Sequence, residues 1–133
     1  MPRPEHPFSY AVLRVVPRVE RGERVNAGVV LFCRGRGYLA ARVQVDDAVL
    51  EALAPDLDRA ALRVHLDALV RVAAGDPGAG PLARLDPSER FGWLVAPSST
   101  VIQPSEVHTG VTEDPDAELG RLVTSLLARP GRR

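Results

Sequence analysis

The chain has 133 residues, the length of a single domain, and 45% of them are hydrophobic, which is too many for a disordered protein. Its formal net charge is zero, its only cysteine is Cys33, and no apolar run approaches the roughly 20 residues of a membrane span. These features exclude an internal disulfide, a metal site built from several cysteines and a transmembrane helix. We expect one domain over residues 1–133, with a core from about 8 to 128 and frayed ends at 1–6 and 129–133.

Two strands are expected first. Alternating residues predict a strand from Phe8 to Val16 that is apolar on both faces except at Arg14, where a charge requires a partner or an open edge. The longest apolar run, from Val25 to Arg34, predicts an inner strand covered on both faces. Gly28 within this strand indicates a bulge, or the close approach of another backbone or of a ligand. Asn26, Gly28, Val30, Phe32 and Arg34 are expected to share one face of this strand.

A hairpin at residues 34–37 leads into a third strand that ends at Val43. These links are too short for a crossover, so the three strands should form an antiparallel meander. Shorter strands are expected over residues 98–103 and 106–111.

Beyond residue 45 the apolar period becomes helical. Aspartate caps and prolines predict four helices, which run from Asp46 or Asp47 to Pro55, from Asp56 or Asp58 to about Ala74, from Asp86 to Pro97, and from Asp114 to Pro130-Gly131. Trp93, in the third helix, is expected to anchor the core. The pattern indicates an α+β fold, with an antiparallel sheet of three to five strands and helices packed mainly on one face.

Common catalytic and binding motifs are not found in the sequence. Arg34-Gly-Arg-Gly37 lacks the following helix that a phosphate loop needs, and no element carries two histidines at metal-ligand spacing. We therefore expect no metal and no cofactor. Cys33 and His108 could form a nucleophile pair only if the fold joined them, and a buried structural cysteine is the preferred interpretation. Nucleic-acid binding is also disfavoured, since aromatics make up 5% of the chain and the net charge is zero.

Two polar tracts are the best candidates for a binding site, one at residues 20–26 leading into Gly28 and one at residues 98–110. If they meet beside the inner strand, the residues that line the site are Tyr10, Arg14, Glu23, Asn26, Gly28, Arg42, Gln103, His108 and Thr109. Ordinary turn and capping chemistry is the competing explanation for Asn26 and His108, and it is preferred for the serines.

Four segments carry a resemblance to a known family: Tyr10–Pro17, Glu23–Phe32, Arg90–Pro97 and Ser99–Gly110. Together they resemble a small bacterial family catalogued as domain of unknown function 3037, over about residues 8–128. The resemblance implies no activity, but it implies a context, because members are often encoded beside a protein that resembles the HipA-type serine/threonine kinases. Gly92 departs from the bulkier polar or aromatic residue, often His, that the family pattern leads us to expect there.

Three functional hypotheses follow. The preferred one is an accessory or binding module, not an enzyme, that works with a protein partner such as a HipA-like kinase. The alternative is a small enzyme acting on a phosphorylated or nucleotide-like ligand, with His108 as acid/base and Arg14 and Arg42 holding the anion. The third is a homodimer formed through an exposed strand edge. The N-terminus lacks the apolar region of a signal peptide, so we expect a cytoplasmic protein without membrane contact.

Overall fold

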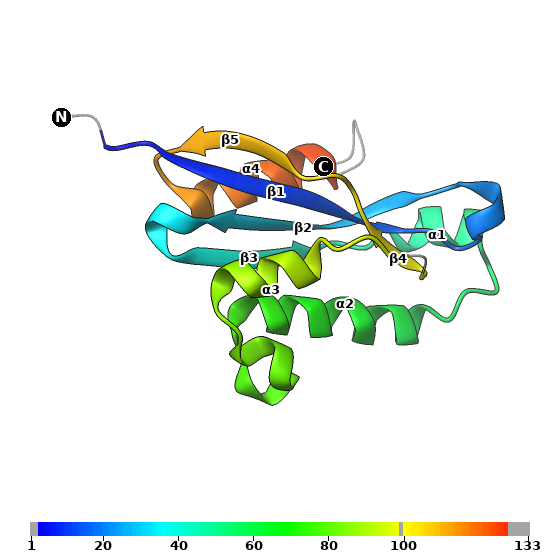
Figure 1. Ribbon diagram of the computed structural model, residues 1–133. Helices are drawn as coiled ribbons and strands as arrows, with labels where there is room; N and C mark the ends of the chain where they lie inside the picture. Colours follow the sequence, from blue (N-terminus) through cyan, green and yellow to red (C-terminus); the bar gives the residue numbers. More distant parts are fainter. Residues whose placement is uncertain (1–2, 99, 128–133) are drawn as a thin grey trace.

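A five-stranded antiparallel sheet with four α-helices forms the molecule, as the computed structural model in Figure 1 shows for residues 3–98 and 100–127. The strands are β1 (His6–Val15), β2 (Val25–Cys33), β3 (Tyr38–Val43), β4 (Ile102–Pro104) and β5 (His108–Thr112). The helices are α1 (Asp47–Leu53), α2 (Arg59–Ala74), α3 (Pro87–Leu94) and α4 (Pro115–Leu126). The predicted α+β fold is confirmed. In the described ranges, no helix combines the length and the apolar character that crossing a bilayer requires.

The sheet has the order β3-β2-β1-β4, and β5 also pairs with β1. All pairings are antiparallel, and the first three strands form the predicted meander. β2 lies between β3 and β1, so the prediction of an inner strand is confirmed. The other side of β1 is shared, because β5 pairs with residues 6–10 and β4 with residues 13–15.

Each face of the sheet has its own hydrophobic core. Ala11, Leu13 and Val15 of β1 pack with residues of α1, α2 and α3, including Leu50, Leu66 and Phe91. Phe8 of β1 and Val29, Leu31 and Cys33 of β2 pack with Leu119 of α4 on the other face. Three helices therefore cover one face of the sheet and α4 covers the other. Figure 1 shows α4 behind the sheet.

A β-bulge interrupts β2 beside Gly28. Leu13 of β1 is opposite Gly28, but the next residue, Arg14, is opposite Asn26, so Ala27 has no partner on β1. The extra residue inverts the alternation, because Ala27 and Val30 contribute to the same core although they are three positions apart, a spacing that places residues of a regular strand on opposite faces. The predicted bulge is confirmed. The expectation that Asn26 shares a face with Gly28 is wrong, and Asn26 lies on the α4 side.

The helices begin where aspartates supply the first acceptors. The side chains of Asp46, Asp58, Asp86 and Asp114 accept hydrogen bonds from the backbone N–H groups of Val49, Ala61, Glu89 and Ala117. Each satisfies one N–H group that has no partner within its helix. Asp46 and Asp58, and not Asp47 and Asp56, are therefore the caps of the first two helices.

Several local expectations differ from the structure. Trp93 is 61% exposed, because Phe91 and Leu94 occupy the buried side of the short helix α3. His6 is paired with Thr112 and is not frayed. The strand expected over 98–103 is limited to β4, and the expected frayed end at 129–133 and the helix end at Pro130-Gly131 lie outside the described residues.

Candidate functional site

The pairing of β1 with β5 brings together the first two candidate residues. Tyr10 and His108 are Cα partners, and their ring centroids lie 5.2 Å apart with an interplanar angle of 31°. Phe8 also stacks with Tyr10, with a centroid separation of 6.1 Å. Because Phe8 and Tyr10 belong to the core beneath α4, the His108 ring extends an aromatic row from that core to the exposed edge of the sheet.

Farther along β1, Arg14 has a candidate residue on each side. Its Cα partners are Asn26 on β2 and Gln103 on β4, so the three lie in one row across the sheet. Side chains of a strand alternate between faces, so this row is on the same face as Tyr10, about 13 Å along the strand. The tracts that contain Asn26 and Gln103 therefore lie on opposite sides of Arg14, with β1 between them, and are not paired with each other beside β2.

Two of these three side chains are engaged in local bonds. Asn26 Nδ2 donates to the carbonyl oxygen of Leu126 at 3.1 Å, which fixes the last turn of α4 over β2. Gln103 Nε2 donates to the carbonyl oxygen of Thr100 at 3.0 Å. Structural roles thus account for much of the polar chemistry at these two positions.

Arg14 differs from its neighbours because, in the described ranges, its guanidinium has no hydrogen bond and no ion pair. It is half-buried on a largely apolar strand. All Asp and Glu residues of the chain fall within residues 3–98 and 100–127, so each of these carboxylates is accounted for. The Arg14 guanidinium is permanently charged, and its five N–H donors are available to a ligand or a partner on this face of the sheet.

The remaining candidates lie apart from this row. Glu23 pairs with Arg21, whose guanidinium hydrogen bond at 2.7 Å lowers the pKa of the Glu23 carboxyl. Arg42 lies on β3, two strands away from Arg14, and its Nη2 binds Asp116 of α4 at 2.8 Å. Gly28 is enclosed between Leu13 and Val43, and Thr109 is opposite Ser9 on the other face. The structure therefore does not bring His108, Arg14 and Arg42 into one anion-holding group.

Cys33 and His108 are also separated. Cys33 is fully buried at the end of β2, in the core beneath α4, and β1 lies between β2 and β5. The thiol is a small apolar core group, which confirms the preferred interpretation of this residue.

A second polar group, which the sequence did not indicate, surrounds a surface cavity of about 470 Å³ at the start of α3. Arg34 Nη2 donates to Ser88 Oγ at 3.1 Å, and the guanidinium carbon lies 5.2 Å from the centre of the Phe32 ring. The Glu89 backbone N–H lowers the pKa of Asp86, and the side-chain hydrogen bond with Asp86 raises the pKa of Glu89. Asp86 and Glu89 could be recognised only as a helix start, because no sequence pattern links them to Arg34.

Comparisons with known proteins identify a family for this chain. The family model described as "Protein of unknown function (DUF3037)" matches residues 10–127 of the 133-residue chain. No curated protein and no solved structure matches. Within residues 3–98 and 100–127, no three His, Cys, Asp or Glu side chains form a group that could hold a metal ion.

Proposed function

This chain belongs to the DUF3037 family of proteins of unknown function, and from that premise we propose that it is an accessory module that binds another protein. The binding surface, which we call the β1 face, consists of Tyr10, Arg14, Gln103 and His108 on the α4 side of the sheet. Among the described residues, no side chain of this set forms a hydrogen bond to another side chain of the set, as an acid/base pair would.

The observation that carries this proposal is the unpaired guanidinium of Arg14. Arginine at a half-buried position is stabilised by a bidentate carboxylate partner, and here the described residues supply none. A partner that places an Asp or Glu side chain over Arg14 would supply the acceptor. Its apolar atoms would pack on the Tyr10 and His108 rings, which provide contact area at low entropic cost.

The family context suggests which partner to test. We propose that the partner is a HipA-like kinase, the neighbour that the family resemblance implies. Titration calorimetry of the purified pair measures the affinity directly. Arg14→Ala should weaken the complex about 30-fold or more, because truncating one member of an interfacial charge pair leaves the other charge unpaired.

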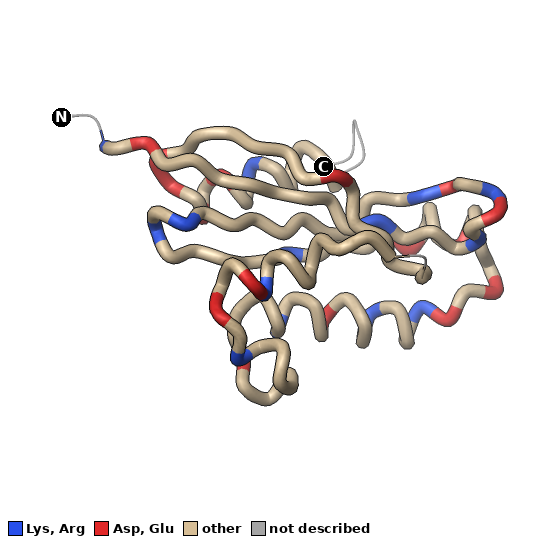
Figure 2. Tube along the Cα trace, in the orientation of Figure 1, with Lys and Arg blue, Asp and Glu red and all other residues tan. Residues whose placement is uncertain are grey.

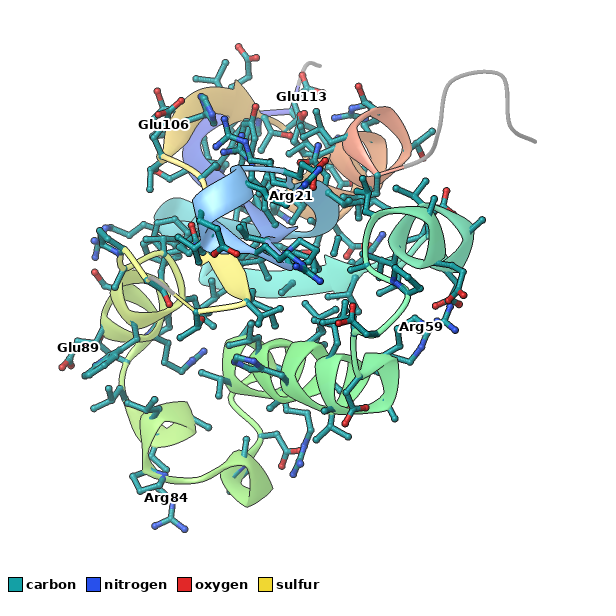
Figure 3. The ribbon with its side chains drawn as sticks, turned by 90° about the vertical axis from the view of Figure 1, so that its right-hand side faces the viewer. Arg21, Arg59, Arg84, Glu89, Glu106 and Glu113 are labelled. Atoms are coloured by element: carbon teal, nitrogen blue, oxygen red, sulfur yellow. The ribbon has the colours of Figure 1, made fainter. Side chains whose placement is uncertain are left out.

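Arg84→Ala is the matched control, since Arg84 is an exposed arginine at the far end of the molecule from β5 (Figure 3). It should bind as tightly as the parent chain. Equal affinity of the Arg14→Ala variant, or separation of the two parent proteins at micromolar concentration, would contradict the proposal.

An enzyme acting on a phosphorylated or nucleotide-like ligand has less support. That hypothesis needs Arg42 beside Arg14, whereas β2 lies between the strands that carry them and Arg42 is bound to Asp116 of α4. It predicts that inorganic phosphate or a nucleotide raises the melting temperature of the parent chain and not that of an Arg14→Ala variant. A rise that disappears in the variant would favour this alternative.

A further inference from the structure

The outer side of β5 is an open sheet edge. β5 pairs with β1 on one side, and in the described part of the chain no strand pairs with its other side. The opposite edge differs, because α2 packs along β3 and Arg42 of β3 carries a charge (Figure 1). Open edges normally carry lysine, other charges or proline, which prevent pairing with another chain. Residues 107–112 contain none of these, and the tube along β5 is uncharged in Figure 2.

Hydrogen bonds elsewhere on β1 define which backbone groups of β5 point outward. The N–H of Ser105 donates to the carbonyl oxygen of Val12, and the N–H of Val16 donates to that of Val101, so even-numbered residues of β1 direct their backbone groups toward β4 and β5. Tyr10 and Phe8 therefore form the hydrogen-bonded pairs with His108 and Gly110. It follows that Thr109 and Val111 direct their N–H and C=O groups away from the sheet, as does Val107 by continuation of the alternation.

We infer that β5 pairs antiparallel with β5 of a second copy of this chain, around a two-fold axis at Thr109. This register places Thr109 opposite Thr109 of the other copy and Val107 opposite Val111. In this register the outward-pointing residues 107, 109 and 111 of one copy are opposite residues 111, 109 and 107 of the other, so three pairs can form hydrogen bonds. A two-fold axis at His108 or Gly110 would allow two such pairs. The same surface of each copy forms this contact, so the assembly ends at two copies.

The side chains of this edge are self-complementary in the same register. Val107 and Val111 are 42% and 59% exposed, and each would gain a β-branched cross-strand partner. On the other face His108 would lie opposite Gly110 of the second copy. The Phe8 ring lies so close to Gly110 that a Cβ there would be 2.8 Å from it, so the aromatic row of Phe8, Tyr10 and His108 would continue across the interface.

Electrostatics also favour a second copy over a charged partner. The net charge of the chain is zero, so two copies have no net repulsion. Glu106 and Glu113 flank the stretch and are not part of it (Figure 3). The proposed dimer uses the β5 edge and does not depend on a partner at Arg14.

Cysteine cross-linking tests the register in the full chain. Opposite residues of a hydrogen-bonded antiparallel pair have Cα atoms about 5.5 Å apart, a separation that a disulfide spans. Thr109→Cys should therefore give a covalent dimer on oxidation. Val111→Cys should not, since Val111 and its copy would be offset by four residues, about 13 Å. Cys33 is fully buried, so the introduced thiol is the accessible one.

Sedimentation at increasing concentration tests the dimer itself. The parent chain should be dimeric, and Val111→Lys should raise the dissociation constant about tenfold or more, because two valine pairs are lost and two charges are introduced. Val64→Lys is the control, since Val64 is 72% exposed on α2 and should leave the dimer intact. Circular dichroism verifies that both variants fold. A monomer at all concentrations, or cross-linking of Val111→Cys as fast as of Thr109→Cys, would overturn the inference.

Discussion

The packing around Gly28 leaves no free space for a side chain. A Cβ on this residue would lie 3.1 Å from Val43 Cγ1, 3.2 Å from Leu13 Cδ1 and 3.3 Å from the carbonyl oxygen of Arg42. The oxygen belongs to the backbone of the paired strand β3, so it cannot move away without disturbing the sheet. Glycine is required here because β2 bulges at the preceding residue, Ala27, while the Leu13 and Val43 side chains close over Gly28.

Gly28→Ala should lower the free energy of unfolding by about 1–3 kcal/mol, the usual range for overpacking a core. Urea unfolding followed by circular dichroism measures the change. Gly92→Ala is the control, because Gly92 is an exposed residue of helix α3 and a Cβ there meets nothing within 4 Å. It should raise stability by about 0.5–1 kcal/mol through helix propensity. A stabilising Gly28→Ala substitution would contradict this account of the bulge.

Helix α4 is attached to the sheet at both ends. At its start, Asp116 accepts hydrogen bonds from Tyr38 Oη at 2.9 Å and from Arg42 Nη2 at 2.8 Å, both on β3. At its end, the carbonyl oxygen of Leu126 accepts from Asn26 of β2. Between these ends Leu119 is fully buried. The polar bonds therefore set the direction of the helix, and its apolar side supplies most of the contact.

Burial and the hydrogen bond to Asp116 raise the pKa of Tyr38 to about 12, from 10.0. The folded state thus binds this proton more tightly than the unfolded state. Stability from this bond is fully present below pH 10, where the phenol is protonated in both states, and it is lost as pH rises from 10 through 12.

Ultraviolet titration of the Tyr10→Phe variant, in which Tyr38 is the remaining tyrosine, should give a phenol pKa of about 12. Asp116→Ala should move its pKa downward, because both the acceptor and the negative charge are removed. Tyr10→Phe leaves one phenol and identifies the signal. If the Tyr38 pKa were the same in the Asp116→Ala variant, the attachment of α4 through Asp116 would be refuted.

In the whole molecule, both cores are built on the same two strands. β1 and β2 contribute alternate residues to the core under α1, α2 and α3 and to the core under α4. Neither helical layer can separate without exposing a face of these strands. Unfolding should therefore be a single cooperative transition, as is usual for domains of this size.

Leu66→Ala and Leu119→Ala test this coupling, since each removes a fully buried side chain from one core. Each should lower the free energy of unfolding by about 2–5 kcal/mol, and both variants should retain one transition in urea. Val64→Ala, at an exposed position of α2, should change stability by less than about 0.5 kcal/mol. A second transition confined to α4 in the Leu119→Ala variant would show that the two layers unfold independently.

The sequence alone determined the elements of this protein. The apolar run at residues 25–33, the hairpin at 34–37 and the capping aspartates encode strands and helices locally, through alternation, chain reversal and satisfied N–H groups. Local sequence signals were weaker where the same residues allowed two ways of packing an element. The eight-residue helix α3 could bury Trp93 or Phe91, and in the fold it is Phe91 that is buried, in contact with the Phe32 ring.

Tertiary structure alone decided which candidate residues lie together. One extra residue at Ala27 placed Asn26 beside Arg14, and the return of the chain to both halves of β1 brought Gln103 and His108 to the same face. It also left β5 as an open edge and placed Arg42 beyond β2. The physical reason is that pairing between distant strands depends on register and on the packing of whole faces, which no stretch of neighbouring residues contains.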